Sequence, residues 1–185
     1  MVKQTAARER VLDAFAELLI EQGERAATLD AVAAAAGVSK GGLLYHFGSK
    51  DALIAGLLER LSELDRTDTE RMRSAPEGVV GYFIRTSVDC GSTFDRTLIA
   101  ASRLAQGQHP QASAVLADIR SSWLQLVEEA VGDPDTARAI VLMADGLYAN
   151  TAQLGTGPAD PAEGSDESID RLLAVIARLL PARER

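Results

Sequence analysis

Apolar residues recur at helical spacing along almost the whole chain, and this pattern restricts the fold more than any other feature of the sequence. In the predicted first helix, residues 6–22, Val11, Phe15 and Leu18 fall on one face. No segment shows the sustained alternation of apolar and polar residues that a half-buried strand requires. We therefore expect an all-α protein of about nine helices, the others over residues 28–37, 39–47, 49–64, 76–88, 94–108, 112–131, 136–154 and 169–180.

Two stretches interrupt this helical pattern. The polar run 66–74 is expected to connect the fourth and fifth helices, and the acidic run 155–168, which contains Gly and Pro, the eighth and ninth. A chain of 185 residues is long enough to bury a core without disulfides or metals. We therefore expect a globular protein of one or two domains.

The single cysteine, Cys90, excludes an intrachain disulfide and with it a disulfide-stapled secreted fold. No apolar run approaches the roughly 18–20 residues of a membrane-spanning helix, and the N-terminus has no apolar signal core. These features predict a cytoplasmic protein. Cys90 itself is interpreted as a small core side chain, with a redox sensor as the alternative.

Charge is distributed unevenly along the chain. The net charge of −8, from 19 Lys and Arg against 27 Asp and Glu, argues against a protein that coats nucleic acid without sequence preference. Residues 1–50, however, hold six basic and six acidic side chains and all three lysines, so the whole acidic excess lies in 51–185. This asymmetry indicates that the two parts have different partners.

The segment 28–50, TLDAVAAAAGVSKGGLLYHFGSK, predicts a helix-turn-helix. Gly37 can adopt the positive φ that the turn needs, and Ser39 is suited to cap the second short helix. Leu43 and Phe47 are four residues apart and would face the core together. The alternative interpretation of this segment is a structural helical hairpin in an enzyme.

The residues on the outer side of the second short helix suit contact with nucleic acid. Lys40 offers a cation, and Tyr45 and His46 offer rings with polar tips. Lys50, at the start of the next helix, is placed to hold a phosphate. We therefore predict that this face reads DNA, and a surface histidine without a ligand is the alternative for His46.

Two features of this segment leave alternatives open. Gly41 and Gly42 would allow the backbone to approach a phosphate or a base edge closely, or they would serve tight packing between helices. Asp30, in the first short helix, would be repelled by a phosphate. It would either accept a hydrogen bond from the N4 amine of a cytosine or simply face solvent.

The pattern GVSKGGLLYHFGSKDAL resembles the N-terminal DNA-binding domain of the TetR family of transcriptional regulators, over about residues 11–58. In that family a three-helix domain with a helix-turn-helix precedes a larger helical domain that binds ligands and forms dimers. The resemblance implies a DNA-binding domain over 1–48 and an effector-binding and dimerisation domain over 49–185. It also implies DNA contacts at Thr28, Ser39, Lys40, Gly41, Gly42, Tyr45, His46 and Lys50.

The sequence departs from the family at two positions of this pattern. Many members have Thr where this chain has Gly42, and Tyr where it has Leu44. That Tyr commonly holds a phosphate, and a leucine cannot form the hydrogen bond. Tyr45, one residue further on, is the candidate to take over this phosphate contact, in addition to its predicted contact with bases alongside Lys40 and His46.

The second part of the chain is expected to carry the dimer interface and the effector site. The predicted helix 136–154 is apolar nearly all round, so it must be buried on two sides. Packing with 169–180 against a second copy would achieve this, and the resemblance implies the same homodimer, which presents two recognition helices to a palindrome. The resemblance also implies a pocket for a small apolar or amphipathic effector, with plain core as the alternative, at Phe83, Phe94, Leu98, Trp123, Met143, Leu147 and Tyr148.

These features predict a one-component transcriptional repressor that binds a palindromic operator as a homodimer and is released by a small-molecule effector. An enzyme is not expected, because the chain has no G-x-S-x-G, P-loop or H-E-x-x-H pattern. Two histidines and one cysteine give no metal-ligand spacing, so no metal or cofactor is expected. The alternatives from other classes are a ligand-binding protein that no longer reads DNA and an enzyme of unknown type.

Overall fold

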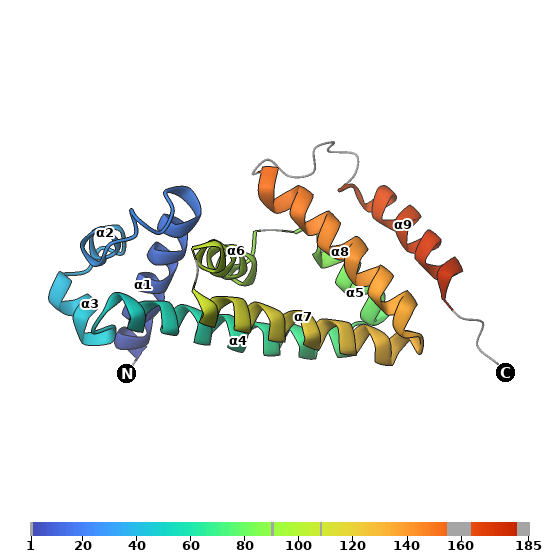
Figure 1. The fold of residues 1–185 in the computed structure, drawn as a ribbon, viewed down its shortest axis with the longest axis horizontal. Coiled ribbons are helices and arrows are strands. Elements are labelled where there is room, and N and C mark those ends of the chain that lie inside the picture. The colour runs from blue at the N-terminus through green and yellow to red at the C-terminus, as the bar shows by residue number, and fades with distance from the viewer. Residues whose placement is uncertain (1, 90, 108, 155–163, 181–185) are drawn as a thin grey trace. The chain divides into compact units, whose positions relative to one another are not determined.

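The structure is a computed structural model that describes residues 2–89, 91–107, 109–154 and 164–180. Cys90 and residues 155–163 of the predicted acidic connection lie outside the described residues. All regular elements within the described ranges are α-helices (Figure 1). They are α1 (Val2–Glu21), α2 (Leu29–Ala35), α3 (Lys40–His46), α4 (Lys50–Ser74), α5 (Gly78–Thr86), α6 (Thr93–Gln106), α7 (Pro110–Val131), α8 (Pro134–Leu154) and α9 (Asp166–Leu179).

These helices form two compact units, and neither is continuous in sequence. The first unit comprises Met1–Asp65 and Thr93–Ala117, and the second comprises Arg66–Ser92 and Asp118–Arg185. The first unit therefore contains α1, α2, α3 and α6, and the second contains α5, α8 and α9. The sequences of α4 and α7 each contribute to both units.

The core of the first unit forms around α1, which packs against α2, α3 and α6. The apolar stripe that the sequence predicted on α1 is buried: Leu18 is 8% exposed, and Val11 and Phe15 are inaccessible to solvent. Leu43 of α3 and Leu57 of α4 are equally inaccessible. Burying side chains of this size, each contributing about 1.5–3 kcal/mol, fixes the short helices α2 and α3 against α1.

The local geometry of the helix-turn-helix follows from its capping residues. Thr28 Oγ1 accepts a hydrogen bond from the backbone N–H of Ala31 at 3.2 Å, and Ser39 Oγ accepts one from Gly42 at 3.0 Å. Gly37 ends the first short helix with φ of +65°, a conformation that L-residues with a side chain rarely adopt. The predicted helix-turn-helix is therefore present with its expected caps.

The prediction that the run 66–74 connects two helices was wrong, because α4 continues without a break to Ser74. The run contains no Gly or Pro, and its residues Thr69 and Met72, three apart, are both buried. Packing of these two side chains in a folded unit stabilises the helix beyond what the polar sequence indicates. The sequence pattern did not indicate this part of α4, because the run contains few apolar residues.

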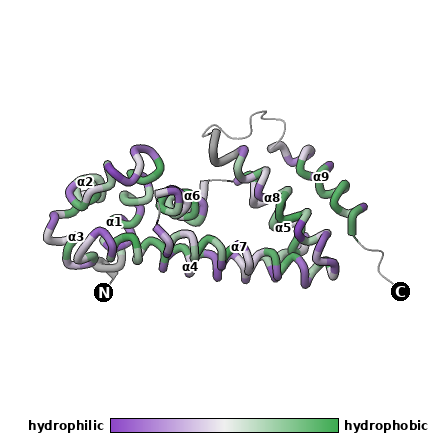
Figure 2. Tube along the Cα trace, in the orientation of Figure 1, coloured by the Kyte–Doolittle hydropathy of each residue, from purple (hydrophilic) through white to green (hydrophobic). Residues whose placement is uncertain are grey.

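The core of the second unit gathers side chains from five helices. Figure 2 shows hydrophobic residues in green along two of them, α5 and α9. The buried members of this core are Met72, Phe83, Ile84, Leu126, Val127, Ala137, Ile140, Val141, Ala144, Ile169 and Ile176. Ion pairs at the edge of this core join Arg85 of α5 to Asp170 of α9 and Arg120 of α7 to Asp145 of α8. In the part of the chain that the structure describes, no helix has the length and apolar character to cross a membrane.

Candidate nucleic-acid interface

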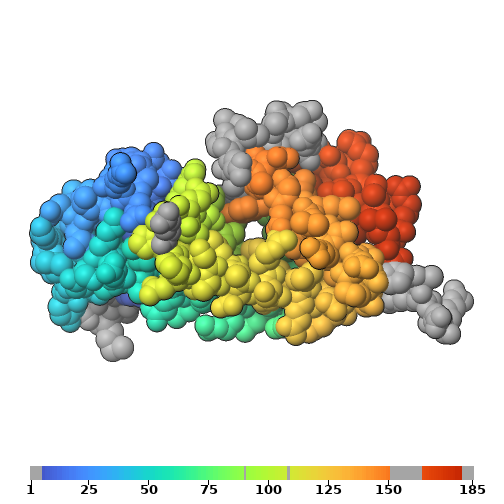
Figure 3. Space-filling view, viewed as in Figure 1, coloured from blue at the N-terminus to red at the C-terminus, as the bar shows by residue number. Residues whose placement is uncertain are grey.

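The helix α3 presents an apolar side to the core and a polar side to solvent. Leu43 and Phe47 are buried, whereas Tyr45 has 75% of its surface exposed. The rings of Tyr45 and His46 meet edge to face with their centroids 5.3 Å apart, and Lys40 is exposed at the start of the helix. Figure 3 shows the α2–α3 segment, in light blue, at the surface of the molecule. The structure thus brings Lys40, Tyr45 and His46 onto one short, accessible helix.

Thr28 and Ser39, both predicted to contact DNA, serve as helix caps. Each hydroxyl oxygen accepts a backbone hydrogen bond, as described above, and both residues are exposed. A hydroxyl that accepts a bond still has its own O–H to donate. Capping therefore leaves each of these side chains able to donate one hydrogen bond to a phosphate oxygen.

The surroundings of Gly41 and Gly42 bear on the two interpretations of this pair. A Cβ atom added at Gly41 would have no neighbour within 4 Å, so packing inside the protein does not require glycine there. A Cβ atom at Gly42 would lie 3.2 Å from the Oγ atom of Ser39. Close contact inside the protein is therefore found at Gly42 and not at Gly41, and approach to DNA at Gly41 stays a prediction.

Lys50 is tied to the connection between α1 and α2. Its Nζ atom donates a hydrogen bond to the backbone oxygen of Glu24 at 2.9 Å and lies 3.3 Å from the Oε1 atom of Glu24. His109 Nε2 lies 3.0 Å from the same carboxylate. The hydrogen bond from His109, with a smaller effect of Lys50, lowers the pKa of the Glu24 carboxyl. Lys50 therefore has an internal structural role in addition to its predicted contact with phosphate.

Asp30 of α2 forms an ion pair with Lys40 of α3. The Nζ atom of Lys40 lies 2.9 Å from Oδ1 and 3.0 Å from Oδ2 of Asp30. Both side chains remain more than half exposed. The sequence predicted either contact with a cytosine or exposure to solvent for Asp30. An ion pair with Lys40 was not among these predictions.

Phe47, directly after α3, packs against α4 and α1. A Cβ atom added at Gly56 of α4 would lie 2.5 Å from Cε1 of Phe47, so only glycine allows the helix to approach this ring so closely. The guanidinium of Arg8 lies 5.5 Å from the centre of the same ring, within the range of a cation–π contact. Phe47 therefore contributes, together with the buried Leu43, to the position of α3.

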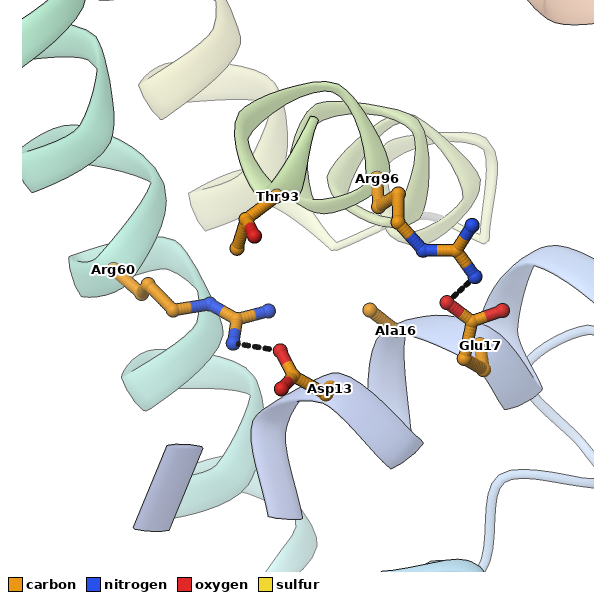
Figure 4. A pocket seen from close by; sticks show the side chains of 6 residues that line it. All are labelled: Asp13, Ala16, Glu17, Arg60, Thr93 and Arg96. Carbon is orange, nitrogen blue, oxygen red and sulfur yellow. Dashed lines mark hydrogen bonds and ion pairs between the residues drawn. The ribbon is translucent and has the colours of Figure 1, made fainter. Parts of the chain in front are cut away.

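A polar cluster inside the first unit joins α1, α4 and α6. The Arg60 side chain, only 6% exposed, donates from Nη1 to Asp13 Oδ1 at 2.7 Å and from Nη2 to Thr97 Oγ1 at 3.1 Å. Arg96 of α6 pairs with Glu17 of α1. Figure 4 shows these groups around a cavity of about 270 Å³ lined by Asp13, Ala16, Glu17, Arg60, Thr93 and Arg96.

Sequence reasoning missed Arg60, although the sequence held a signal for it. Arg60 lies within the apolar stripe of α4, three residues after Leu57 and one before Leu61, both of which are buried. A charged residue that keeps a core-facing position needs a partner, because an unpaired buried charge is unstable. The partner could not be identified, because Asp13 and Thr97 are distant in sequence.

The residues predicted to line an effector pocket are divided between the two units. Phe94 and Leu98 lie on α6 of the first unit, and the other five lie in the second. In the second unit the Phe83 and Trp123 rings lie 5.7 Å apart between centroids, with Met143 and Leu147 packed on the same core. Tyr148 of α8 is half-buried. Among the residues described, no group of three or more His, Cys, Asp or Glu side chains could hold a metal ion.

Both parts of the chain match known families. Residues 11–57 match the family described as bacterial regulatory proteins, tetR family, and residues 77–177 match the tetracyclin repressor-like C-terminal domain. The HTH-type transcriptional regulator UidR of Escherichia coli (strain K12) is 28% identical over 130 residues, which cover 68% of this chain and 65% of UidR. The match therefore spans slightly less than two thirds of that relative.

Solved structures with a similar fold include a multidrug binding protein and a repressor. The multidrug binding protein EbrR complexed with malachite green has a TM-score of 0.66 at 25% identity, covering 95% of this chain and 98% of EbrR. NalD, the secondary repressor of the MexAB-OprM multidrug efflux pump in Pseudomonas aeruginosa, has a TM-score of 0.69 at 20% identity over 100% of both chains. At that identity NalD supports the fold alone.

Proposed function

This chain belongs to the TetR family of transcriptional regulators, and we propose that it is a repressor that binds a palindromic operator as a homodimer and is released by a small-molecule effector. In this proposal residues 1–48 read the DNA, and residues 49–185 bind the effector and form the dimer in the cytoplasm. The observation that carries the proposal is the exposure of α3, where Lys40 and Tyr45 are exposed and His46 is half-buried, while Leu43 and Phe47 are buried in the core. Such a short helix, with its polar face uncovered, suits insertion into the major groove.

The experiment that tests the proposal is selection of genomic DNA fragments by the purified full-length protein. The salt concentration is held at about 0.15 M, because non-specific binding falls steeply with salt. An enriched palindrome supports the proposal and identifies the regulated gene. The absence of enrichment, both alone and after addition of a small-molecule library, would contradict it and favour a ligand-binding protein that does not read DNA.

Lys50→Ala tests whether Lys50 holds a phosphate or only ties α4 to the α1–α2 connection. If it holds a phosphate, the slope of log K against log salt becomes shallower by about 0.9 for each phosphate that the variant no longer neutralises, at all DNA sequences alike. The measurement is binding to operator and to random DNA at several salt concentrations. An unchanged slope with a lower melting temperature would show that Lys50 has only the structural role given by its bonds to Glu24.

An aromatic, amphipathic effector is the class that the relatives favour. EbrR has been solved in complexes with ethidium and with malachite green. In this chain, Phe83, Trp123, Met143, Leu147 and Tyr148 supply aromatic and apolar surface in the second unit, and Phe94 and Leu98 supply it on α6. We propose each of these residues as an effector contact within its own unit, which alanine substitution and dye-binding measurements would test.

The hydrogen bonds of Arg60 support a mechanism in which displacement of α6 changes the position of the helices proposed to bind DNA. Arg60 bonds both to Thr97 of α6 and to Asp13 of α1, so displacement of α6 relative to α4 has to break or move a bond that reaches α1. An effector that favours the displaced arrangement would lower operator affinity. A coupling of about 1–3 kcal/mol is typical and corresponds to a 5- to 150-fold change.

Apolar side chains exposed on α8 and α9 support a homodimer through residues 136–154 and 169–180. Leu142 is 55% exposed, and Val175, Leu179 and Leu180 are also exposed. Leu142→Ala is expected to remove about 1 kcal/mol of burial for each copy, so the dimer dissociation constant rises about 30-fold. Analytical ultracentrifugation measures this constant.

The matched control is Leu44→Ala, which removes a similarly exposed leucine from α3. It should leave the dimer dissociation constant unchanged, because α3 lies outside the proposed interface. Equal effects of the two substitutions, or none from Leu142→Ala, would contradict the proposed interface.

A further inference from the structure

The ion pair between Asp30 and Lys40 is not explained by the stability of the fold. The side chains of Lys40 and Asp30 are 57% and 71% exposed, and exposed ion pairs of this kind contribute little to folding. An acidic side chain beside a DNA-binding helix also weakens attraction to the phosphate backbone. A carboxylate at this position therefore weakens attraction to DNA. Its place in the first turn of α2 stabilises that helix, and its contact with Lys40 gives it a second effect.

The pairing changes what Lys40 can do at DNA. Both oxygens of Asp30 lie within 3.0 Å of the Nζ atom, so the charge of the ammonium is compensated at close range. An ammonium group has three N–H donors, and a single carboxylate leaves donors over. The pair is thus a neutral unit that still presents N–H groups at the first residue of α3. A lone lysine at this position would instead bind any nearby phosphate.

We propose that Asp30 is a specificity-determining residue: by compensating and orienting Lys40, it directs this lysine to the acceptor edge of a guanine and away from phosphates. The O6 and N7 atoms of guanine are the acceptors that a lysine donor recognises in the major groove. The proposal rests on the proposed role of α3 as the DNA-reading helix. It assigns Asp30 a positioning role, since the carboxylate acts on the DNA through Lys40.

Direct contact of Asp30 with a cytosine is a weaker explanation. Such a contact requires the carboxylate to accept a hydrogen bond from the cytosine N4 amine. Both carboxylate oxygens already lie at hydrogen-bond or ion-pair distance from Lys40. Turning Asp30 to a base would separate it from the lysine, so the two functions compete.

The test compares wild type with Asp30→Asn on the selected operator and on random DNA of the same length, over about 0.05–0.3 M salt. In the variant, Lys40 becomes an uncompensated cation. The slope of log K against log salt is then expected to steepen by about 0.9 for each protomer. Affinity for random DNA should rise, and the ratio of operator to random affinity should fall about tenfold.

Two further variants separate the proposed role from general electrostatics. Asp51→Asn removes the same charge from an exposed site in the first turn of α4, outside the ion pair. It should raise affinity for operator and random DNA alike and leave their ratio unchanged. In a Lys40→Met background, Asp30→Asn should no longer change the ratio, because the side chain that it acts on is absent.

Each outcome has a defined meaning. If wild type shows no operator preference, the proposed function fails before the inference is reached. If wild type prefers the operator but Asp30→Asn changes neither the ratio of operator to random affinity nor the slope of log K against log salt, the inference alone is wrong. It is also wrong if Asp51→Asn lowers the ratio equally. A purely structural role of Asp30 in the first turn of α2 would lower the melting temperature without altering the salt slope.

Discussion

Replacement of Tyr45 by alanine is expected to remove most of the preference for operator over random DNA. Tyr45 is the most exposed large side chain on α3, and its ring points away from the core. A side chain that reads a base typically contributes about 1–3 kcal/mol of discrimination, and a two-fold dimer uses two copies of it. The expected reduction is therefore about 2–6 kcal/mol of discrimination, measured as the ratio of the two dissociation constants.

Two controls accompany this prediction: the melting temperature of Tyr45→Ala, which reports whether the variant folds, and the conservative variant Tyr45→Phe. Because Tyr45 is 75% exposed, Tyr45→Ala should leave the melting temperature close to that of wild type. Tyr45→Phe keeps the ring and removes only the hydroxyl, so it separates apolar contact from hydrogen bonding. A folded Tyr45→Ala variant with wild-type specificity would show that α3 does not read bases through this residue.

Phe47→Ala is expected to lower the free energy of unfolding of the first unit by about 3–5 kcal/mol. The ring is 4% exposed and fills the space that Gly56 leaves open, with Arg8 above it. Truncation would leave a cavity between α3 and α4, since a rigid helix backbone cannot move in to close it. Operator binding should weaken as well, because α3 would lose its support.

The measurement is urea denaturation followed by far-UV circular dichroism, with Leu44→Ala as the control from the exposed side of α3. The control should change the unfolding free energy by no more than about 0.5 kcal/mol. Phe47→Leu keeps most of the buried volume and should recover a large part of the stability. A Phe47→Ala variant as stable as the control would mean that the ring is not a core residue.

Local signals made the helix-turn-helix predictable from the sequence. Ser39 and Gly37 act on residues within one helical turn of themselves, so their effect can be read from neighbouring letters. The inward direction of Leu43 and Phe47 follows from their spacing of four. The same holds for the long stripe of α4, where Leu53, Leu57 and Leu61 are all inaccessible to solvent.

The polar contacts of the site were not predictable, because they join residues that are distant in sequence. Arg60 and Asp13 are 47 residues apart, and Lys50 and Glu24 are 26 apart. A charged residue on a helix does not indicate which of many opposite charges it will meet. Hence the predicted role of Lys50 omitted its tie to the α1–α2 connection.

The sequence also could not separate ligand-binding residues from core residues in the second unit. Phe83 and Trp123 were chosen as large apolar side chains, and the structure packs them against one another. The same residue types serve both purposes, since a ligand pocket is lined by apolar and aromatic side chains. Only a bound molecule or a binding measurement distinguishes the two.

The first unit draws on Met1–Asp65 and on Thr93–Ala117, and this has a consequence for biosynthesis. At roughly 5–20 residues per second, the ribosome needs several seconds to proceed from the end of α3 to the end of α6. During that interval the nascent helix-turn-helix has no α6 to cover α1, and Arg60 lacks its bond to Thr97. Translation therefore has to reach Gln106 before the first unit, with its helix-turn-helix, can fold completely. A nascent chain that stalls earlier would leave this unit incompletely folded.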